Sequence, residues 1–371
     1  MKGKKAKLIS AILLLFVTLA LSAEQIIVTD LAGRKVFLEV PVHRVVLASG
    51  RHVHEFAAVA GKDFLDRIAG WGPDLNLYDQ DTYDKYFEII PEIADVPDVG
   101  YHYKGTFSTE RVISLNPEVV IFPLWLVENG DVMADIDKLE LAGIPSIFID
   151  YNKKPFENPI KSTLLLGTLL GKEERAREIT DFYKKQVDII YSRLKEIDKP
   201  RPTVYLEVGS KGPAVYGNTY SNVKGWGAVI DRCRGTNIAE GVIEKSGPIH
   251  PEYLLTSNPD IIIFSGSYWP STSDSMRLGY HAETETSTDI LSAFTKRPGW
   301  NTLDSVKNHN VHSIFHGFSF RIYNFAGIQA FAKWFYPDEF QDLDPVTNLK
   351  EFHNRFMPVE YSGVWMLDLR N

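Results

Sequence analysis

The feature that most constrains this chain is an internal repeat at a constant offset of 142 residues. Residues 108–122 read STERVISLNPEVVIF, and residues 250–264 read HPEYLLTSNPDIIIF. Five of the fifteen positions are identical and six more are conservative. Generic helix-turn-strand chemistry explains the Asn-Pro pair and the apolar run, but it does not require a glutamate at the same register. The chain therefore contains two related halves.

Each copy of the repeat predicts a short helix, a turn and a buried strand. Asn116-Pro117 and Asn258-Pro259 end the helix, because proline drives the residue before it out of the helical region. The runs that follow are continuous, apolar and mostly β-branched, as expected for parallel strands covered on both faces. Strands alternating with helices in both halves predict two α/β lobes. The predicted strands are Arg44–Ala48, Val119–Phe122, Ser146–Asp150, Thr203–Val208, Ile261–Phe264 and Val311–Phe315.

A long helix is predicted between the two halves. Residues 172–197 contain no glycine or proline, and their apolar residues recur at three- and four-residue steps, which forms one stripe. Such a helix is about 39 Å long, enough to pass from one lobe to the other. The sequence Lys-Pro-Arg-Pro at 199–202 ends it. We therefore divide the chain into a signal peptide (1–23), an N-terminal lobe (24–158), a linker helix region (159–199) and a C-terminal lobe (200–371).

The first 23 residues have the three-part layout of a secretory signal peptide. Four lysines without an acid precede an unbroken apolar stretch, Leu8–Leu21, and the small residues Ser22 and Ala23 follow. The stretch is shorter than the ~20 residues that a membrane span needs. An uncleaved N-terminal anchor is the alternative interpretation. Because no cysteine stands at the cleavage point to carry a lipid, we expect the mature protein to be free in the periplasm.

Charge and cysteine content argue against several functions. Cleavage removes four lysines and moves the formal net charge from -8 to -12, which opposes binding to nucleic acid. Cys233 is the single cysteine, so an internal disulfide and clusters built on several thiolates are excluded. The chain also has no G-x-S-x-G elbow and no phosphate-binding loop ending in G-K-S/T. An enzyme therefore finds little support, although metal chelatases share this kind of two-lobed chain.

Six segments carry a resemblance to a known family: residues 44–46, 107–122, 166–176, 235–239, 250–264 and 303–307. In order and spacing they resemble the helical-backbone (class III) periplasmic binding proteins that serve ABC importers of ferric siderophores, heme and cobalamin. The resemblance covers nearly the whole mature chain. It implies two Rossmann-like lobes with parallel central sheets, joined by a single long α-helix, in a monomer that is not an enzyme.

The resemblance also implies a partner and a cargo. In such proteins the paired glutamates, here Glu110 and Glu252, lie on the outer rim of each lobe and engage arginines of the importer's permease subunits. A carboxylate in the first helical turn is favoured by the helix dipole and stays exposed, although two ordinary helix-start acids would look the same. The implied cargo is a ferric siderophore first, then cobalamin or another corrinoid, heme, and finally a metal ion or an oxyanion. We expect no separate cofactor.

Ligands of this fold lie between the lobes, at loops that follow the strands. We expect Arg51 and Arg321 to clamp an anionic ferric chelate across the cleft, while aromatic rings cover its apolar rim. The candidate ligand-binding residues are Arg51, His52, Trp71, Tyr78, Tyr101, Tyr103, Trp125, Tyr216, Trp226, Tyr268, Trp269, Arg321 and Tyr323.

Histidines near the first strand leave a second interpretation open. His52 and His54 alternate as H-V-H, and His43 and His102 are candidates to join them. Imidazoles bind zinc or manganese well, so the chain could hold a metal directly. No carboxylate accompanies them at a telling spacing, and we therefore assign no metal ligands. A surface adhesin or sensor domain is the third class, which the paired glutamates disfavour.

Overall fold

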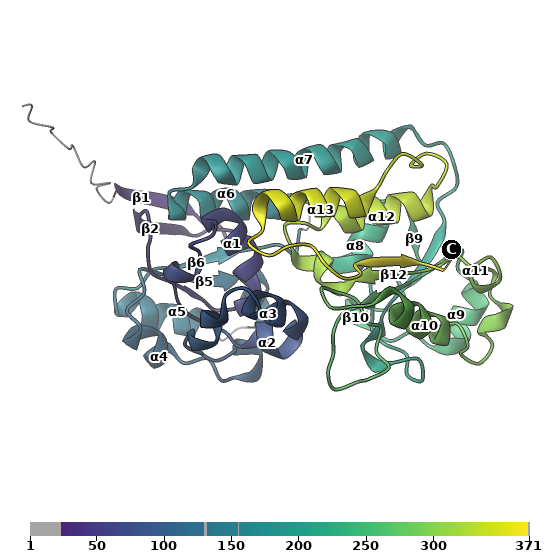
Figure 1. Ribbon diagram of the computed structural model, residues 1–371, viewed down its shortest axis with the longest axis horizontal. Helices are drawn as coiled ribbons and strands as arrows, with labels where there is room; N and C mark the ends of the chain where they lie inside the picture. Colours follow the sequence, from purple (N-terminus) through teal and green to yellow (C-terminus); the bar gives the residue numbers. More distant parts are fainter. Residues whose placement is uncertain (1–23, 130–131, 155, 370–371) are drawn as a thin grey trace, which may run out of the picture.

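The computed structural model describes residues 24–129, 132–154 and 156–369, so the predicted signal peptide lies outside the described residues. Two α/β lobes lie side by side below one long helix in the view of Figure 1. Within the described ranges, no helix is both long enough and apolar enough to cross a membrane. The predicted fold class, two α/β lobes with parallel central sheets, is confirmed.

The N-terminal lobe is built on a four-stranded parallel sheet in the order β4-β3-β5-β6. All four strands are buried, as the continuous apolar runs predict for a sheet covered on both faces. The strands are β3 (Val45–Leu47), β4 (Ile68–Trp71), β5 (Val119–Pro123) and β6 (Ser146–Ile149). The helices are α1 (Val53–Ala60), α2 (Asp74–Tyr78), α3 (Gln80–Phe87), α4 (Thr109–Ser114) and α5 (Val132–Leu141).

The C-terminal lobe has a five-stranded sheet in the order β13-β12-β11-β7-β9, parallel except for β13 at the edge. Its strands are β7 (Thr203–Val208), β9 (Thr236–Asn237), β11 (Ile261–Gly266), β12 (Val311–Phe315) and β13 (Met366–Asp368). A small ladder joins β8 (Thr219–Tyr220) and β10 (Ser246–Gly247). The helices are α8 (Gly225–Arg232), α9 (Pro251–Ser257), α10 (Thr284–Phe294), α11 (Asp304–Lys307), α12 (Phe325–Phe335) and α13 (Pro345–Phe356).

The sequence repeat is also a repeat of backbone conformation. Each copy forms a short helix, α4 or α9, followed by a turn and a central strand, β5 or β11. Asn116 and Asn258 take the same left-handed conformation, with φ of 47° and 40°. Asparagine enters this region more readily than most residues, because its side chain can bond locally to the backbone. The predicted helix-turn-strand unit is therefore confirmed in both halves.

Two helices form the connection between the lobes. Helix α6 (Asn158–Leu170) packs on the N-terminal lobe, the chain turns at Gly171, and α7 (Glu173–Glu196) runs across to the C-terminal lobe. The predicted linker helix over 172–197 is confirmed within one residue at each end. Lys172 and Ile197 flank it outside helical geometry.

The long helix does not span the lobes alone, which the sequence did not predict. Helices α12 and α13 lie along α7 in Figure 1, and α12 packs directly against it. The Phe182 ring on α7 lies 5.6 Å from Phe325 on α12 and 5.7 Å from Phe356 on α13. A single connected set of buried apolar residues therefore runs from one lobe through these helices into the other.

A β-hairpin at the start of the described chain was also not predicted. It pairs β1 (Glu24–Thr29) with β2 (Lys35–Val40) in antiparallel register. Val36, Leu38 and Val40 alternate with exposed residues along β2, so one face of the hairpin is buried. Helix α6 packs against this strand. The hairpin thus extends the N-terminal lobe beneath the connecting helices.

Candidate ligand cleft

Two adjoining cavities lie between the lobes, and both have volumes suited to part of a small molecule. The first has a volume of about 330 Å³ and the second about 450 Å³. We call the two together the cleft. Side chains that line both cavities come from both lobes, which makes the cavities one continuous site. They are Arg51, Tyr103, Trp125, Lys224 and Phe320.

Arg51 is held in the cleft by the turn that follows β3. The Arg51 Nε atom lies 2.9 Å from Asp74 Oδ2, and the Gly50 N–H donates to Asp74 Oδ1 at 2.7 Å. Glycine is needed there, since a Cβ on Gly50 would stand 2.4 Å from the Gly72 carbonyl oxygen. Burial opposes the charge of Arg51, but the Asp74 carboxylate outweighs it and raises the pKa of the guanidinium. Arg51 is therefore a fixed cation in the cleft, with its side chain 21% exposed.

Arg321 does not face Arg51 as a second free cation. It lines the first cavity, but its side chain is 1% exposed and its Nη2 lies 2.7 Å from Asp79 Oδ2 in the N-terminal lobe. Asp79 also lies 3.6 Å from His54 Nε2. The expected pair of arginines clamping a ligand is thus not seen: Arg321 serves as a buried link between the lobes, because an unpaired guanidinium at that depth would be costly.

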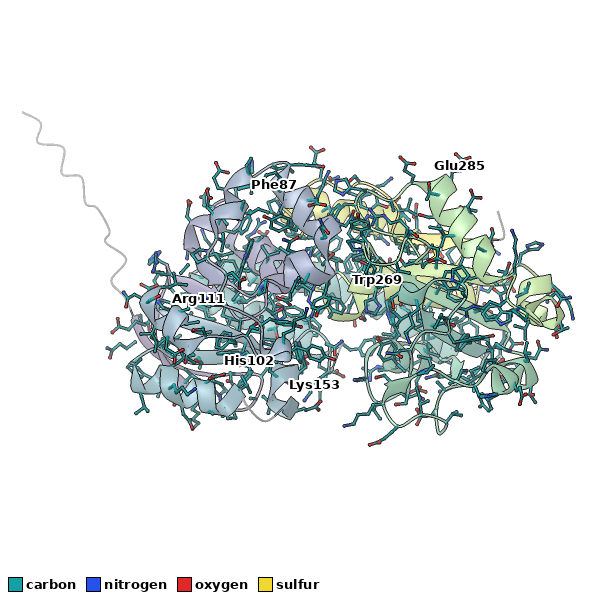
Figure 2. The ribbon with its side chains drawn as sticks, turned by 90° about the horizontal axis from the view of Figure 1, so that it is seen from below. Phe87, His102, Arg111, Lys153, Trp269 and Glu285 are labelled. Carbon is teal, nitrogen blue, oxygen red and sulfur yellow. The ribbon has the colours of Figure 1, made fainter. Side chains whose placement is uncertain are left out.

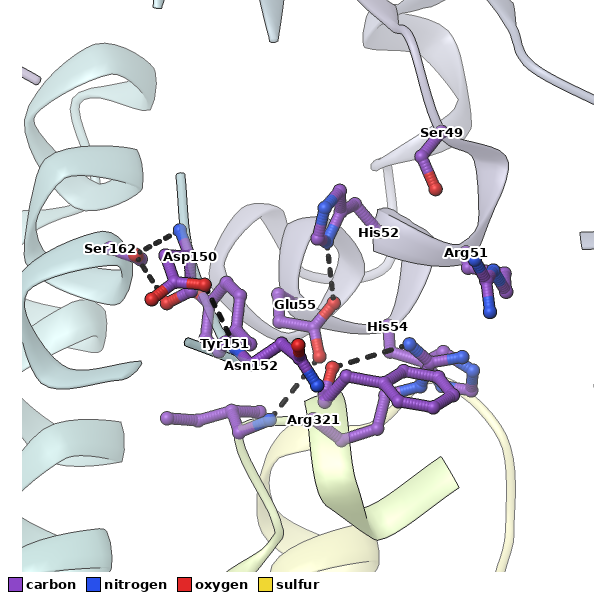
Figure 3. A network of polar contacts seen from close by, with 12 residues as sticks. Ser49, Arg51, His52, His54, Glu55, Asp150, Tyr151, Asn152, Ser162 and Arg321 are labelled. Carbon is purple, nitrogen blue, oxygen red and sulfur yellow. Dashed lines mark hydrogen bonds and ion pairs between the residues drawn. The ribbon is translucent and has the colours of Figure 1, made fainter. Parts of the chain in front are cut away.

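We call the buried polar contacts of Arg321, Ile322 and Tyr323 with the N-terminal lobe the buried link. Figure 3 shows Glu55 and His54 beside Arg321. The backbone N–H of Ile322 donates to Glu55 Oε1 at 3.2 Å, and the Tyr323 hydroxyl lies 3.2 Å from His54 Nδ1. His52 lines the first cavity, and its Nδ1 lies 3.5 Å from Glu55 Oε2. Burial lowers the pKa of His54, so this imidazole is neutral at neutral pH.

Aromatic rings cover the wall of the cleft on the N-terminal lobe. The ring of Tyr101 lies 5.9 Å from Tyr78, 6.2 Å from Tyr103 and 6.5 Å from Trp125. The Arg51 guanidinium lies 5.1 Å from the ring centre of Phe320, which belongs to the other lobe. Trp269 lies between the lobes in Figure 2 and lines the second cavity. A ligand in the cleft would therefore meet a cation flanked by ring faces.

The structure brings eight of the thirteen predicted residues to the lining of the cleft and leaves five elsewhere. Trp71 is buried in β4, Trp226 stacks on Phe331 in the core, and Tyr323 is fully buried. Tyr216 packs against Trp300, while Tyr268 covers the guanidinium of Arg277. The eight that line the cleft are Arg51, His52, Tyr78, Tyr101, Tyr103, Trp125, Trp269 and Arg321.

Sequence reasoning missed several lining residues, although some carried a usable signal. Lys224 precedes the Gly-x-Gly start of α8, and His316 and Phe320 follow the end of β12. Lys224 comes directly before a helix and His316 directly after a strand. Both lie at the cleft edge of a parallel sheet, where ligands of α/β folds bind. The lining residues missed are Ser49, Asp79, Pro123, Glu128, Ile149, Asp150, Tyr151, Asn152, Tyr220, Lys224, Ser267, Phe315, His316, Gly317 and Phe320.

The histidines of the direct-metal interpretation do not gather. His54 points into the buried link, His102 stacks on Phe107 at 4.1 Å, and His43 lies on the surface of the N-terminal lobe. Over the described ranges, no group of three histidine, cysteine or acidic side chains is placed to hold a metal ion.

The paired glutamates occupy equivalent positions on the two lobes. Glu110 is the second residue of α4 and Glu252 the second residue of α9, and both are exposed. The Ser108 side chain caps α4 by accepting from the Arg111 N–H at 3.1 Å, while Pro251 begins α9. In Figure 1 these two helices lie on different lobes, on the side away from α7. The two carboxylates are thus free to meet a partner on that side.

The fold and the cleft together define a class: a two-lobed binding protein that holds a small ligand between its lobes. The chain belongs to the periplasmic binding protein family, whose model matches residues 58–314. It is the periplasmic substrate-binding component of an ABC transporter. Members of this family bind substrates for transport rather than convert them.

Comparison with known proteins supports this placement. A crystal structure of the TroA-like periplasmic binding protein FepB from Veillonella parvula is 41% identical, with a TM-score of 0.89 over 92% of this chain and 99% of that one. An uncharacterized ABC transporter substrate-binding lipoprotein of Bacillus subtilis, YvrC, is 24% identical over 71% of this chain and 73% of its own. The molybdate-binding MolA of Haemophilus influenzae shares the fold, at 17% identity and a TM-score of 0.67 over 91% of this chain and 99% of that one.

Proposed function

We propose that this protein captures an anionic iron chelate, of the ferric siderophore kind, in the cleft and delivers it to the membrane permease. The observation that carries the proposal is Arg51, a partly exposed guanidinium that lines both cavities and is fixed by Asp74 at 2.9 Å. An oxygen-rich anion suits a guanidinium better than an ammonium, because the planar fork donates two parallel hydrogen bonds.

The surroundings of Arg51 support a ligand that is both charged and aromatic. Lys224 lines both cavities, and the Lys104 ammonium lies 5.8 Å from the ring centre of Tyr78. Tyr78, Tyr103 and Trp125 offer ring faces on the same wall. A chelate with aromatic arms around an iron centre would place its rings on this wall and its negative oxygens toward the cations. Heme and corrinoids are larger alternatives with the same combination of rings and charge.

Delivery is assigned to the two rim glutamates. Glu110 and Glu252 stand at the same helical position on the two lobes, and the Glu252 side chain is 89% exposed. Hydrogen bonds from its own backbone N–H and from Ser108 lower the pKa of Glu110, which keeps this carboxylate ionised in a mildly acidic periplasm. Two fixed negative charges on one face match a permease that presents arginines.

The cargo is tested with protein isolated from its own periplasm. Native mass spectrometry gives the mass of the bound molecule, and ferric catecholates, heme and corrinoids each have a distinct visible spectrum. Arg51→Gln should weaken binding of a ferric catecholate by about 10- to 100-fold, since a hydrogen bond to a charged group contributes about 1.5–3 kcal/mol. Arg177→Gln, an exposed arginine on α7, is the matched control. A colourless protein that carries only an oxyanion would contradict the proposal.

The delivery role has a separate test. Uptake of the cargo is measured in cells that carry Glu110→Ala and Glu252→Ala together, with Glu285→Ala on α10 as an exposed control. Uptake should fall with the double variant while cargo binding by the purified protein stays unchanged. Unchanged uptake would remove the assignment of these two residues.

A further inference from the structure

A loop of the C-terminal lobe, residues 277–281, reaches the N-terminal lobe at helix α3, and we call it the crossing loop. The Arg277 Nη2 atom lies 2.6 Å from Asp81 Oδ1, and the backbone N–H of His281 donates to Asp81 Oδ2 at 3.2 Å. In Figure 1, α3 lies on the side of the N-terminal lobe that faces the other lobe. These three residues do not line the two cavities, so this contact between the lobes is separate from the cleft.

The backbone of the crossing loop is fixed close to Asp81. Gly279 has a φ of 125°, which other residues rarely adopt, and a Cβ there would stand 2.4 Å from Asp81 Oδ2. The Gly279 N–H donates to the Val364 carbonyl at 2.7 Å, and the Val364 N–H donates back at 3.1 Å. The loop is therefore anchored to its own lobe while it touches the other.

Both ring nitrogens of His281 contact carboxylates of the N-terminal lobe. Its Nδ1 lies 2.9 Å from Asp81 Oδ1, and its Nε2 lies 2.8 Å from Glu88 Oε1. An ionised carboxylate only accepts hydrogen bonds, and a neutral imidazole has a single N–H to donate. Both contacts are hydrogen bonds only when the ring carries two protons. The geometry therefore requires an imidazolium that bridges two acids of the opposite lobe.

The charges around His281 favour that form. They lie on α3 and on the crossing loop: Asp81, Asp84, Lys85, Glu88 and Arg277. Burial opposes the charge of His281, but its hydrogen bonds to Glu88 and Asp81 outweigh this and raise the pKa of the imidazole. The side chain is 36% exposed, so it can exchange its proton with water.

We propose that His281 is a pH-dependent latch between the lobes. With two protons it bonds Asp81 and Glu88 at once, and after losing one it can bond only one of them, so the lobes separate more readily. Separation removes both acids, which makes the proton less tightly held in the open form. The closed form is therefore favoured at lower pH and loses this advantage as pH rises through the range in which His281 titrates, while the carboxylates stay ionised.

The consequence is a cleft whose opening depends on pH. The inference goes beyond the proposed function, because it needs no particular cargo. In a mildly acidic periplasm the latch is closed, and a captured ligand should leave slowly. Between about pH 5.5 and about pH 8.5, the range around the titration of a histidine, the open fraction should rise by about two- to fivefold, as expected for a partly exposed ion pair.

The test measures the distance between the lobes without any ligand. Spin labels are attached at Lys138→Cys on α5 and Glu285→Cys on α10, both exposed, while the native Cys233 is fully buried and takes no label. Pulsed electron paramagnetic resonance at about pH 5.5 and about pH 8.5 gives the fraction of longer distances, which should rise with pH. His281→Gln should show the larger fraction at both pH values, and His281→Arg, which stays charged, the smaller one.

A second measurement and a matched control separate titration from packing. Nuclear magnetic resonance of labelled imidazoles should give His281 a pKa above the ordinary value of about 6.5, and Glu88→Gln should lower it. His250 lies 4.0 Å from Glu252 of its own lobe, so His250→Gln removes a histidine–acid contact that does not join the lobes. This variant should leave the distances and their pH dependence unchanged.

Three results would overturn the latch. The first is a distance distribution of the wild-type protein that is the same at both pH values. The second is a pH dependence that persists in His281→Gln, because another group would then control the opening. The third is a His281 pKa below about 6.5, which would exclude the bridging imidazolium. The cargo and the delivery role are judged by their own tests, since no ligand or permease is present in this one.

Discussion

At the scale of single residues, one arginine of the cleft is accessible to a ligand and the other holds the two lobes together. Arg51 is partly exposed and lies in the cavity, whereas Arg321 is buried and paired with Asp79 of the other lobe. Both are arginines that follow a strand, and both looked equivalent in the sequence. They differ in the carboxylate with which each pairs. Asp74 holds Arg51 at the edge of the cleft, whereas Asp79 pairs with Arg321 in the buried interior.

The Arg321 link should be important for stability. Asp79→Asn leaves a buried guanidinium without its carboxylate, so the free energy of unfolding should fall by about 3–5 kcal/mol. Urea unfolding followed by tryptophan fluorescence measures the loss. Asp342→Asn breaks the exposed pair between Asp342 and Arg193 and should leave the unfolding midpoint unchanged. Equal effects of the two variants would show that Arg321 finds another partner.

His353 on α13 should make stability depend on pH. Its Nδ1–H donates to the Leu349 carbonyl at 2.9 Å, and its Nε2 lies 3.0 Å from the Tyr280 hydroxyl. Burial lowers the pKa of His353 to about 4, whereas an unfolded histidine titrates near 6.5. The unfolded state therefore binds the proton first as pH falls, and stability should drop between about pH 6.5 and about pH 4, by up to about 1.4 kcal/mol per pH unit for one histidine.

Urea unfolding at several pH values between about 7.5 and about 4.5, which covers the range in which histidines titrate, measures this dependence. His353→Gln should reduce the slope of the unfolding free energy against pH by the contribution of one protonating group, about 1.4 kcal/mol per pH unit at most. The buried His54 and the partly buried His316, whose pKa values are also lowered, should keep the remainder. A slope that is the same in His353→Gln and wild type would assign the pH dependence to other groups.

At the scale of elements, an aromatic layer between α7, α12 and α13 connects the lobes. Phe182 lies at its centre, in contact range of Phe325, Phe352 and Phe356. The stripe on α7 that the sequence shows is therefore buried rather than left exposed between two lobes: it packs on α6 and α1 of the N-terminal lobe and on α12 of the C-terminal lobe.

Removing the central ring should destabilise the whole protein. Phe182→Ala deletes a 7% exposed side chain and should lower the free energy of unfolding by about 3–5 kcal/mol. Chemical denaturation measures it. Phe87→Ala removes a 44% exposed ring on α3 and is the control, for which little change is expected. If only one lobe of the Phe182 variant lost its structure during denaturation, the lobes would be shown to unfold independently.

The sequence predicted the elements well and the contacts between them less well. Strands β7 and β12 begin and end at the predicted residues, because buried apolar runs bounded by turns define them locally. Burial of Trp226 and Tyr323 could not be predicted in the same way, since an aromatic residue after a strand suits a cleft and a core equally. The pairing of Arg321 with Asp79 joins residues 242 positions apart, and no local pattern encodes it.

At the scale of the whole molecule, the lobes are joined on two levels. Helices α7, α12 and α13 connect them above the cleft, and Arg321, Ile322 and Tyr323 bind the N-terminal lobe at its base. Arg277 and His281 add a third contact, because both reach Asp81 on α3, at 2.6 and 2.9 Å. Opening the cleft widely would break buried charge pairs.

Ligand binding should therefore change the shape of the protein very little. Small-angle scattering with and without a ferric bis-catecholate complex should show a change in radius of gyration below about 1 Å, in line with preorganised binding sites. Arg277→Gln with His281→Gln removes one contact between the lobes and should allow a larger change. A large compaction of the wild-type protein would contradict the rigid connection.

The matching placement of Glu110 and Glu252 has a consequence for docking. Each is the second residue of its helix, one on each lobe, so the two proposed docking acids have the same local setting. A permease built from two identical subunits has a twofold axis, and it would present the same surface to each of the two acids. The binding protein could then dock in either of two orientations, and both would be productive.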